Sequence, residues 1–392
     1  MQMLRFPPWP AFDEDEVAAV SAVLRSGKVN YWTGEHGRLF EKEFAASHSV
    51  AHAIAVSNGS VALAMALRAL QLPPNSEVIV TPRTFVASVS EIVLAGHAPV
   101  FADIDRDSQN VTAESIAPLI SDRTAAILVV HLAGWPCDMS EIVELASTHG
   151  LRVVEDCAQA HGATVDGRPV GSWGDVATFS YCQDKIMTTG GEGGMVVTDN
   201  EELWARCWSF KDHGKSTALL DASKSLPVFR FVHDTIGTNY RMTEMQAAIG
   251  RIQLRKLSGW VERRRQNAAT LAEALEDIDA LRIPLPPGER SYHAYYKFYA
   301  FVRPEALKPG WTRDRIVAEI LDRGVPCGSG ICPETYLEGA FQDTGFAPEQ
   351  RLPVATELGE TSLMFQVHPT LSSEDMRDMA GAVRVVLEKA TR

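Results

Sequence analysis

Two side chains that could take part in catalysis, Asp156 and Lys185, each follow a short apolar run of the sequence. A lysine amine can form a Schiff base with a carbonyl compound, and a carboxylate at a buried strand end must be paired with a cation to be stable. Each has an ordinary alternative, because a lysine beside a loop is usually solvated and an aspartate often caps a helix. The glycine-rich segment 190–194 is neither a P-loop nor a dinucleotide fingerprint, since the spacing of both motifs is absent.

A phosphate site is predicted at Gly59 and Ser60, which lie between an expected strand and a helix that starts near residue 61. Amides at a helix N-terminus, with a hydroxyl beside them, bind phosphate, although a plain helix cap is the alternative. Phe85 follows the next strand, where it could stack on a planar ring or belong to the core. Taken together, these residues supply what pyridoxal phosphate requires: a lysine, an acid for the pyridine nitrogen, phosphate donors and a flat surface.

Strands and helices that must position these residues alternate along the first two-thirds of the chain. Apolar runs typical of buried strands lie at 53–56, 77–80, 100–102, 125–130, 151–154, 177–181 and 194–198, and helical patterns lie at 61–70, 86–95 and 139–149. This alternation predicts an α/β fold with a mostly parallel central sheet covered by helices. Ligands of such sheets bind beyond the carboxyl ends of the strands, where Asp156 and Lys185 occur.

The last third of the chain predicts a second domain. A long helical stretch at 243–275 is followed by a strand-like run at 296–302 and by helical patterns at 313–323 and 373–389. We therefore expect a large cofactor-binding domain over 1–259 and a smaller C-terminal α/β domain over 260–392. The opening segment 1–25 could pack on either.

Composition excludes several classes of function. The chain has 392 residues and a net charge of −13, which argues against nucleic-acid binding and against docking on an anionic membrane. No apolar run is long enough to span a membrane, and the first residues lack the apolar core of a signal peptide. The six cysteines have neither metal-binding nor disulfide-scaffold spacing. We expect a cytoplasmic protein with free thiols and no metal site.

Longer motifs connect these pieces to a known family. The sequence resembles the DegT/StrS family of sugar aminotransferases, a branch of the fold-type I pyridoxal-phosphate enzymes. The resemblance covers nearly the whole chain and is strongest at residues 56–60, 84–85, 101–105, 155–163, 179–198 and 237–248. It implies the fold of a fold-type I transferase and pyridoxal 5'-phosphate as the cofactor.

The resemblance also implies a role for individual residues. Lys185 would hold the cofactor as a Schiff base and act as general acid and base, while Asp156 would pair with the pyridine nitrogen. Gln159 would lie near the ring and its 3-oxygen, and Phe85 would stack on the ring. Relatives that carry histidine in place of the lysine act as dehydratases, so Lys185 favours transamination.

Further cofactor contacts come from the phosphate end. Gly59, Ser60 and Ser180 would hold the phosphate, and Asn239 resembles an asparagine that reaches the phosphate of a neighbouring subunit. The protein would then be a homodimer with shared active sites. His161 does not take the place of the lysine, and we interpret it as a structural histidine behind the cofactor.

The implied substrates are an amino donor, L-glutamate or glutamine, and a nucleotide-linked keto-deoxysugar, on the route to an amino sugar of a surface polysaccharide or glycosylated metabolite. Residues that could contact the acceptor are Lys28, Tyr31, Trp32, His213, His293 and Tyr336, and further cations that could offset its diphosphate are Arg38, Arg83, Lys211, Lys215 and Arg230. Three alternatives remain open: a keto-cyclitol (scyllo-inosose-type) aminotransferase, an aminohydroxybenzoate-type synthase and a non-catalytic regulatory paralogue.

Overall fold

The computed structural model describes residues 4–222, 231–288 and 290–392. Its α-helices are α1 (Glu14–Ser26), α2 (His36–His48), α3 (Gly59–Leu70), α4 (Ala87–Leu94), α5 (Ala113–Ile116), α6 (Met139–His149), α7 (Glu201–Lys211), α8 (Thr217–Ala222), α9 (Glu244–Leu275), α10 (Arg313–Leu321), α11 (Pro353–Thr361) and α12 (Ser373–Ala390). Its strands are β1 (His52–Val56), β2 (Glu77–Val80), β3 (Ala98–Phe101), β4 (Thr124–Val130), β5 (Arg152–Asp156), β6 (Thr164–Val165), β7 (Arg168–Pro169), β8 (Val176–Ser180), β9 (Gly194–Thr198), β10 (Leu281–Arg282), β11 (Ser291–Tyr292), β12 (Phe298–Val302), β13 (Cys327–Gly328) and β14 (Ser362–Phe365).

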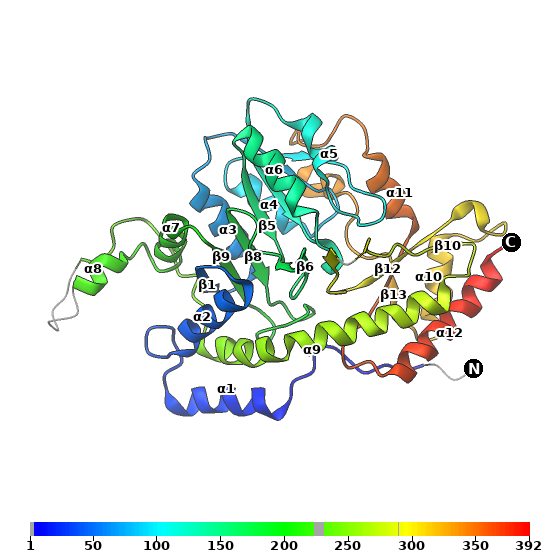
Figure 1. The fold of residues 1–392 in the computed structure, drawn as a ribbon, viewed down its shortest axis with the longest axis horizontal. Helices are drawn as coiled ribbons and strands as arrows, with labels where there is room; N and C mark the ends of the chain where they lie inside the picture. Colours follow the sequence, from blue (N-terminus) through cyan, green and yellow to red (C-terminus); the bar gives the residue numbers. More distant parts are fainter. Residues whose placement is uncertain (1–3, 223–230, 289) are drawn as a thin grey trace.

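A seven-stranded sheet forms the centre of the molecule, in the order β1-β9-β8-β5-β4-β2-β3. Neighbours from β8 to β3 pair in parallel, and β9 is antiparallel to both β8 and β1. Consequently β1 runs in the same direction as β8. Helices cover the sheet on both faces (Figure 1). The predicted α/β fold with a mostly parallel sheet is confirmed.

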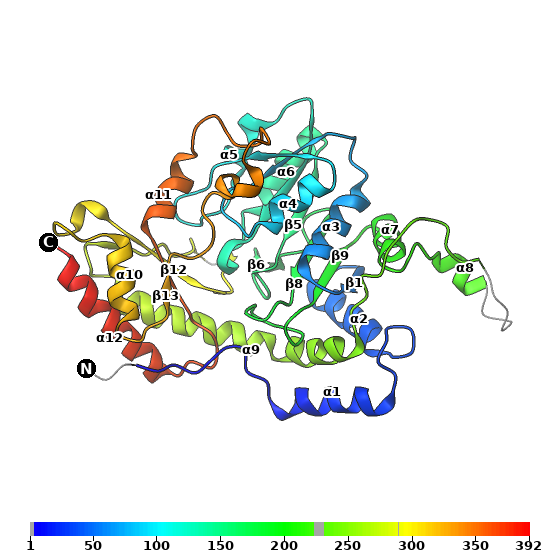
Figure 2. The ribbon, with the colours of Figure 1, turned by 180° about the vertical axis from the view of Figure 1, so that it is seen from behind.

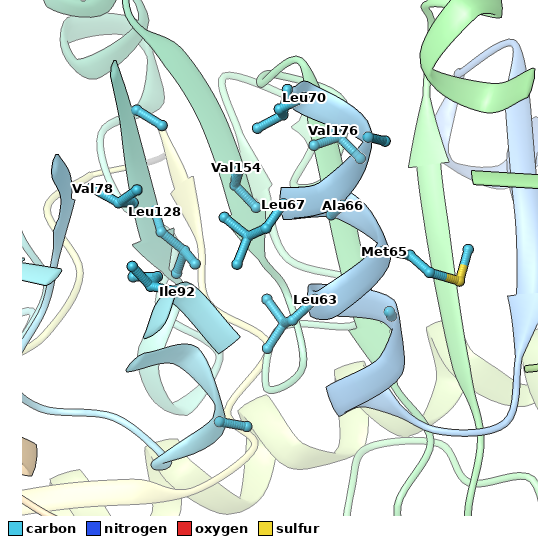
Figure 3. Packing of buried hydrophobic residues seen from close by; sticks show 14 of the residues in the cluster. Leu63, Met65, Ala66, Leu67, Leu70, Val78, Ile92, Leu128, Val154 and Val176 are labelled. Carbon is cyan, nitrogen blue, oxygen red and sulfur yellow. The ribbon is translucent and has the colours of Figure 1, made fainter. Parts of the chain in front are cut away.

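Helix α3 shows how the core is built. Asn58 caps its first turn by accepting a hydrogen bond from the Val61 amide at 3.0 Å, and the following residues are almost all apolar. Leu63 and Leu67 are buried against the strands of the sheet (Figure 3). Burying one such leucine contributes roughly 1.5–3 kcal/mol. This packing fixes the N-terminus of α3 beside the sheet edge.

Helix α9 runs from the sheet to the C-terminal elements (Figures 1 and 2). Thr243 and Gln246 form a capping box at its start, and its 32 residues span about 48 Å at 1.5 Å each. Helices α1, α2 and α12 all pack against it. Because α9 continues through residue 260, a domain boundary at that position would lie inside a helix, and the division into 1–259 and 260–392 stays a proposal.

The C-terminal third forms a four-stranded antiparallel sheet in the order β10-β12-β14-β13, with a core of its own. A small three-stranded sheet, β11-β6-β7, lies apart from both larger sheets. The opening segment contacts several parts of the molecule. Leu4 and Phe6 pack on the C-terminal core, whereas α1 lies along α9 (Figure 2).

Candidate active site

Four strands that run in one direction bring the expected cofactor residues to one edge of the sheet. Gly59 begins α3 directly after β1, Phe85 follows β2, Asp156 ends β5 and Ser180 ends β8. Lys185 lies in the loop after β8. The edge is the carboxyl end of the parallel strands, where ligands of such sheets bind.

The Asp156 carboxylate is buried and accepts hydrogen bonds from two nearby groups of the described chain. Its side chain is 5% exposed, and it accepts hydrogen bonds from the Ser88 hydroxyl at 2.8 Å and the Ala158 amide at 3.1 Å. Ser88 in turn pairs with the Thr84 hydroxyl at 2.8 Å. Burial raises the pKa of Asp156, and the Ser88 hydrogen bond and the charge of Lys185 oppose that rise. Turns rather than a helix follow Asp156, so its interpretation as a helix cap is wrong.

The neighbouring acid, Glu155, has a structural task. Its carboxylate accepts hydrogen bonds from the Gly171 and Gly174 amides at 2.8 and 2.7 Å and lies 3.1 Å from His131 Nε2. Burial raises the pKa of Glu155, but the hydrogen bonds from His131 and from these amides outweigh it, so the net shift is downward. A fully paired Glu155 therefore fixes the end of β5, which orients Asp156.

The start of α3 and the end of β8 form a narrow cradle. A Cβ built on Gly59 would lie only 2.7 Å from the Ser180 Cβ, so this position excludes any side chain. The Ser180 hydroxyl accepts a hydrogen bond from the Cys182 amide at 3.3 Å, and the first-turn amides of α3, including those of Gly59 and Ser60, lack partners within the helix. This combination suits a phosphate group.

Lys185 is fixed through its main chain. Its amide donates to the Cys182 carbonyl at 3.1 Å, and its carbonyl accepts a hydrogen bond from the Trp9 indole at 2.8 Å. Trp9 belongs to the opening segment, and its ring is perpendicular to that of Trp260 on α9, with 5.2 Å between the ring centres. The Lys185 amine lies 5.0 Å from the centre of the Tyr296 ring.

The remaining cofactor candidates differ in exposure. Gln159 is buried, and its Oε1 accepts a hydrogen bond from the Ala133 amide at 2.8 Å. Phe85 is 61% exposed, so its ring is available to a planar ligand. Asn239 is exposed next to Tyr240, whose carbonyl accepts a hydrogen bond from Ser57 at 2.9 Å. Asn239 therefore lies near the carboxyl end of β1 in its own chain.

His161 is buried next to aromatic residues of β8 and of the segment that follows it. Its ring lies 5.4 Å from Phe179 and 5.5 Å from Tyr181, and neither ring nitrogen has a hydrogen-bond partner within the described part of the chain. Burial lowers its pKa well below the usual value, so the ring is neutral.

Some of the acceptor candidates form a second cluster. The Trp32 indole donates to Asp212 at 3.3 Å, and Lys215 pairs with the same carboxylate at 2.9 Å. Lys215 also lies 4.0 Å from the centre of the Trp32 ring, and the buried Lys211 amine lies 3.8 Å from that of Tyr31. This aromatic and cationic cluster adjoins Asn239, which pairs with Asp212 in a backbone bridge.

The other acceptor candidates differ in their exposure and contacts. Lys28 and His213 are exposed, and Arg38 lies 4.9 Å from the centre of the Tyr31 ring. Arg83, His293 and Tyr336 are buried, with hydrogen bonds from Arg83 to Gln109, from Tyr295 to His293 and from Leu352 to Tyr336. Arg230 lies outside the described residues. These assignments stay predictions.

Sequence reasoning missed several residues of the site. Ser88 lies one helical turn after Thr84, a spacing that could have indicated their hydrogen bond. Trp9, Tyr296 and Lys297 have no local signal, because each reaches Lys185 or its neighbour from a distant segment.

The donor set fits pyridoxal phosphate. One edge of the sheet holds a lysine, a buried carboxylate, an exposed aromatic ring and the cradle at the start of α3. A Cβ at Gly59 would fill this cradle, so the glycine leaves the space that a phosphate needs. Fold and site together define a pyridoxal-phosphate-dependent enzyme.

Comparisons with known proteins give the family. The model of the DegT/DnrJ/EryC1/StrS aminotransferase family matches residues 10–384. The GDP-perosamine synthase of Escherichia coli O157:H7 is 35% identical over 88% of this chain and 88% of its own. A UDP-N-acetyl-3-dehydro-alpha-D-glucosamine 3-aminotransferase of Acidithiobacillus ferrooxidans is 35% identical over 90% and 89%. The X-ray structure of an aminotransferase from Psychrobacter cryohalolentis has a TM-score of 0.96 and 52% identity, covering 98% of this chain and 100% of that one.

The chain belongs to the DegT/DnrJ/EryC1/StrS aminotransferase family, as its motifs predicted, and it is an aminotransferase that uses pyridoxal phosphate. Within the described residues, no helix is both long and apolar enough to cross a membrane.

Proposed function

We propose that this protein transfers the amino group of L-glutamate or glutamine to the keto group of a nucleotide-linked deoxysugar, which yields an amino sugar for a surface polysaccharide or a glycosylated metabolite. The observation that carries the proposal is the sheet edge that joins Lys185, Asp156 and the Gly59–Ser180 cradle. The names of the two curated relatives, one GDP-linked and one UDP-linked, support a nucleotide sugar as acceptor and leave the nucleotide open.

Each residue has a distinct chemical role in this proposal. When bound, the cofactor supplies an electron sink for the carbanion formed at the amino-bearing carbon. The Lys185 amine would act as the base that removes the proton from that carbon and as the acid that returns it when the amino group is transferred. Asp156 keeps the pyridine nitrogen protonated, and the buried position of its carboxylate strengthens that pairing. Gly59, Ser60 and Ser180 hold the phosphate.

We also propose that the active form is a two-fold dimer. Helix α8 projects from the body of the molecule (Figure 1), and the side chains of Leu219 on α8 and Ile236 further along the chain are 42% and 86% exposed; residues 212–222 and 231–239 are called the arm. Exposed apolar side chains on an arm suit a second copy of the chain. Asn239, which pairs with Asp212 in a backbone bridge at the end of α7, lies at the base of this arm and would contact the partner's cofactor phosphate.

Mixed dimers test this arrangement. When Lys185→Ala and Asn239→Ala chains are combined, a shared site leaves one intact site in each mixed dimer, so up to about a quarter of wild-type activity returns. If Asn239 served only its own chain, every site would carry a defect and no activity would return.

We place the reaction in the cytoplasm, because all six cysteines are free thiols, as in a reducing compartment. The first test of function is the visible absorption spectrum of the protein with pyridoxal phosphate, before and after L-glutamate is added. The cofactor band should bleach, and a keto-sugar should restore it. Free keto-cyclitols and aminohydroxybenzoate precursors serve as competing acceptors.

The Lys185→Ala variant should lose the covalent cofactor and all turnover. Turnover at the wild-type rate in this variant would rule out the proposed role of the lysine. A wild-type spectrum that no amino donor changes would favour the regulatory paralogue.

A further inference from the structure

Three cations, one of them the catalytic lysine, and one carboxylate all contact Tyr296. The amines of Lys185 and Lys297 lie 5.0 and 4.6 Å from the centre of the Tyr296 ring. The Tyr296 hydroxyl donates to Asp184, the one carboxylate of the group, and the guanidinium of Arg264 donates to the Tyr296 carbonyl at 3.2 Å.

Lys297 is poorly paired for a lysine that is largely removed from water. Its side chain is 13% exposed, its amine lies 4.0 Å from the Asp184 carboxylate, and it donates to the Gln366 side chain at a long 3.4 Å. Burial, and then the charges of Arg264 and Lys185, lower the pKa of Lys297 to about 8, while Asp184 opposes the shift. An anion at this amine would improve its pairing.

Arg264 adds a second buried positive charge. It is 1% exposed, and its Nε and Nη2 atoms have no hydrogen-bond partner in the described part of the chain. Burial lowers its pKa to about 9. His368 faces both Arg264 and Lys297 and is neutral, because burial and these two charges lower its pKa to about 3.

The charge count leaves an excess of positive charge. Even with the Lys185 amine bound to the cofactor, Lys297 and Arg264 oppose only Asp184. Unpaired buried charges are costly, so a site with this composition favours an anionic ligand. Cofactor phosphate is accounted for at the Gly59–Ser180 cradle, which leaves the substrate as the source of the anion.

We propose that Lys297 binds the α-carboxylate of the amino-acid donor, an inference that rests on the proposed transamination. The donor's amine must reach the point where the Lys185 amine acts, and its α-carboxylate is attached to the same carbon. Lys297 lies against the same Tyr296 ring as Lys185, so its ammonium is placed for that carboxylate. Glutamate and glutamine share this group, so the assignment holds for either donor.

The test compares two ligands and three variants. L-Glutamate and its α-amide, L-isoglutamine, differ only at the α-carboxyl position, which is a carboxylate in the first and a neutral amide in the second. In the wild type, the cofactor band should respond to L-glutamate at a concentration roughly 10- to 100-fold lower than to L-isoglutamine. Lys297→Met should remove this preference by weakening L-glutamate alone, Lys297→Arg should keep it, and Lys308→Met, at an exposed lysine, is the control.

The pH dependence gives a second readout. Binding requires the protonated amine, so wild-type affinity for L-glutamate should fall as pH rises through about 8, the pKa of Lys297. Lys297→Arg stays charged and should not show this fall, and comparing the two proteins with the same ligand cancels the titration of the donor. The groups that face Lys297 are Asp184, Lys185, Arg264, Tyr296 and His368.

The outcomes separate this inference from the proposed function. If wild-type protein does not respond to any amino donor, the proposed function is wrong. If it responds to L-glutamate but Lys297→Met keeps the preference over L-isoglutamine, or weakens both ligands equally, Lys297 does not bind the α-carboxylate. Should Lys297→Met fail to fold, the pH profiles of wild type and Lys297→Arg decide, and identical profiles would overturn the assignment.

Discussion

Replacing Ser88 with alanine should weaken the pairing of Asp156 with the pyridine nitrogen, although Ser88 is not assigned a contact with the cofactor. Within the described residues, the Ser88 hydroxyl and the Ala158 amide, at 2.8 and 3.1 Å, are the two donors to the buried Asp156 carboxylate. Ser88→Ala would remove the hydroxyl donor from Asp156 Oδ2. Because Asp156 is only 5% exposed, water has little access to replace the lost hydrogen bond. The neutral, protonated form of Asp156 would then become more favourable.

The magnitude follows from the kind of hydrogen bond that is lost. A hydrogen bond to a buried charged group contributes about 1.5–3 kcal/mol, which corresponds to roughly 10- to 100-fold in an equilibrium or a rate. We expect kcat/KM to fall by that factor. Burial already raises the pKa of Asp156, and the carboxylate is present only above its pKa, so losing Ser88 should move the acid limb of the pH–rate profile to higher pH.

Steady-state kinetics across pH, with an absorption spectrum of each variant, measure both effects. Ser90→Ala, two residues further along α4, is the matched control, since its hydroxyl does not contact Asp156. Thr84→Val should have a weaker effect, because Thr84 acts only through Ser88. Wild-type kcat/KM together with an unmoved acid limb in Ser88→Ala would refute the reasoning.

Three further predictions concern the cradle, the opening segment and α9. Gly59→Ala should weaken pyridoxal-phosphate binding at least about tenfold in a fluorescence titration, because its Cβ would lie 2.7 Å from Ser180, and unchanged affinity would contradict the cradle. Trp9→Phe retains an aromatic ring, though a smaller one, and removes the hydrogen bond to the Lys185 carbonyl, so thermal unfolding should show a loss of at least about 0.5–1.5 kcal/mol, and an unchanged Tm would count against that contact. Lys256→Met leaves three carboxylates on α1 and its cap facing one another and should lower stability by about 1–3 kcal/mol at neutral pH, with less loss at low pH where those groups are protonated.

The central sheet could be predicted because its signals are local. The strands β1, β2 and β4 are apolar runs that are each followed by a helical pattern, and the predicted runs at 53–56, 77–80 and 125–130 agree with them. The C-terminal sheet was harder, since β10 and β13 have two residues each and carry no periodic pattern. Their pairing depends on partners far along the chain.

The residues of the site also fall into two groups, those with a local sequence signal and those without one. Lys185 and Asp156 could be found from their positions after apolar runs, with motifs that supply their roles. The Trp9–Lys185 hydrogen bond joins residues 176 positions apart, and Lys297, which directly precedes β12 of the C-terminal sheet, approaches Asp184 from a distant part of the chain. The acceptor candidates were chosen by residue type alone, and residue type does not determine which of them fold together. Tyr31 and Trp32 share a cluster, whereas His293 and Tyr336 are buried elsewhere.

The opening segment has a consequence for biosynthesis on the ribosome. The Leu4 amide donates to the Arg323 carbonyl, and the Thr370 hydroxyl donates to the Pro8 carbonyl, 362 positions away. Residues made at the start of translation therefore wait for segments made near its end before they can dock. Contacts of such long sequence separation form late in folding. Because Trp9 directly follows Pro8, we expect its hydrogen bond to the Lys185 carbonyl to become stable only when these late segments have folded, so that the catalytic loop is completed after synthesis of the chain.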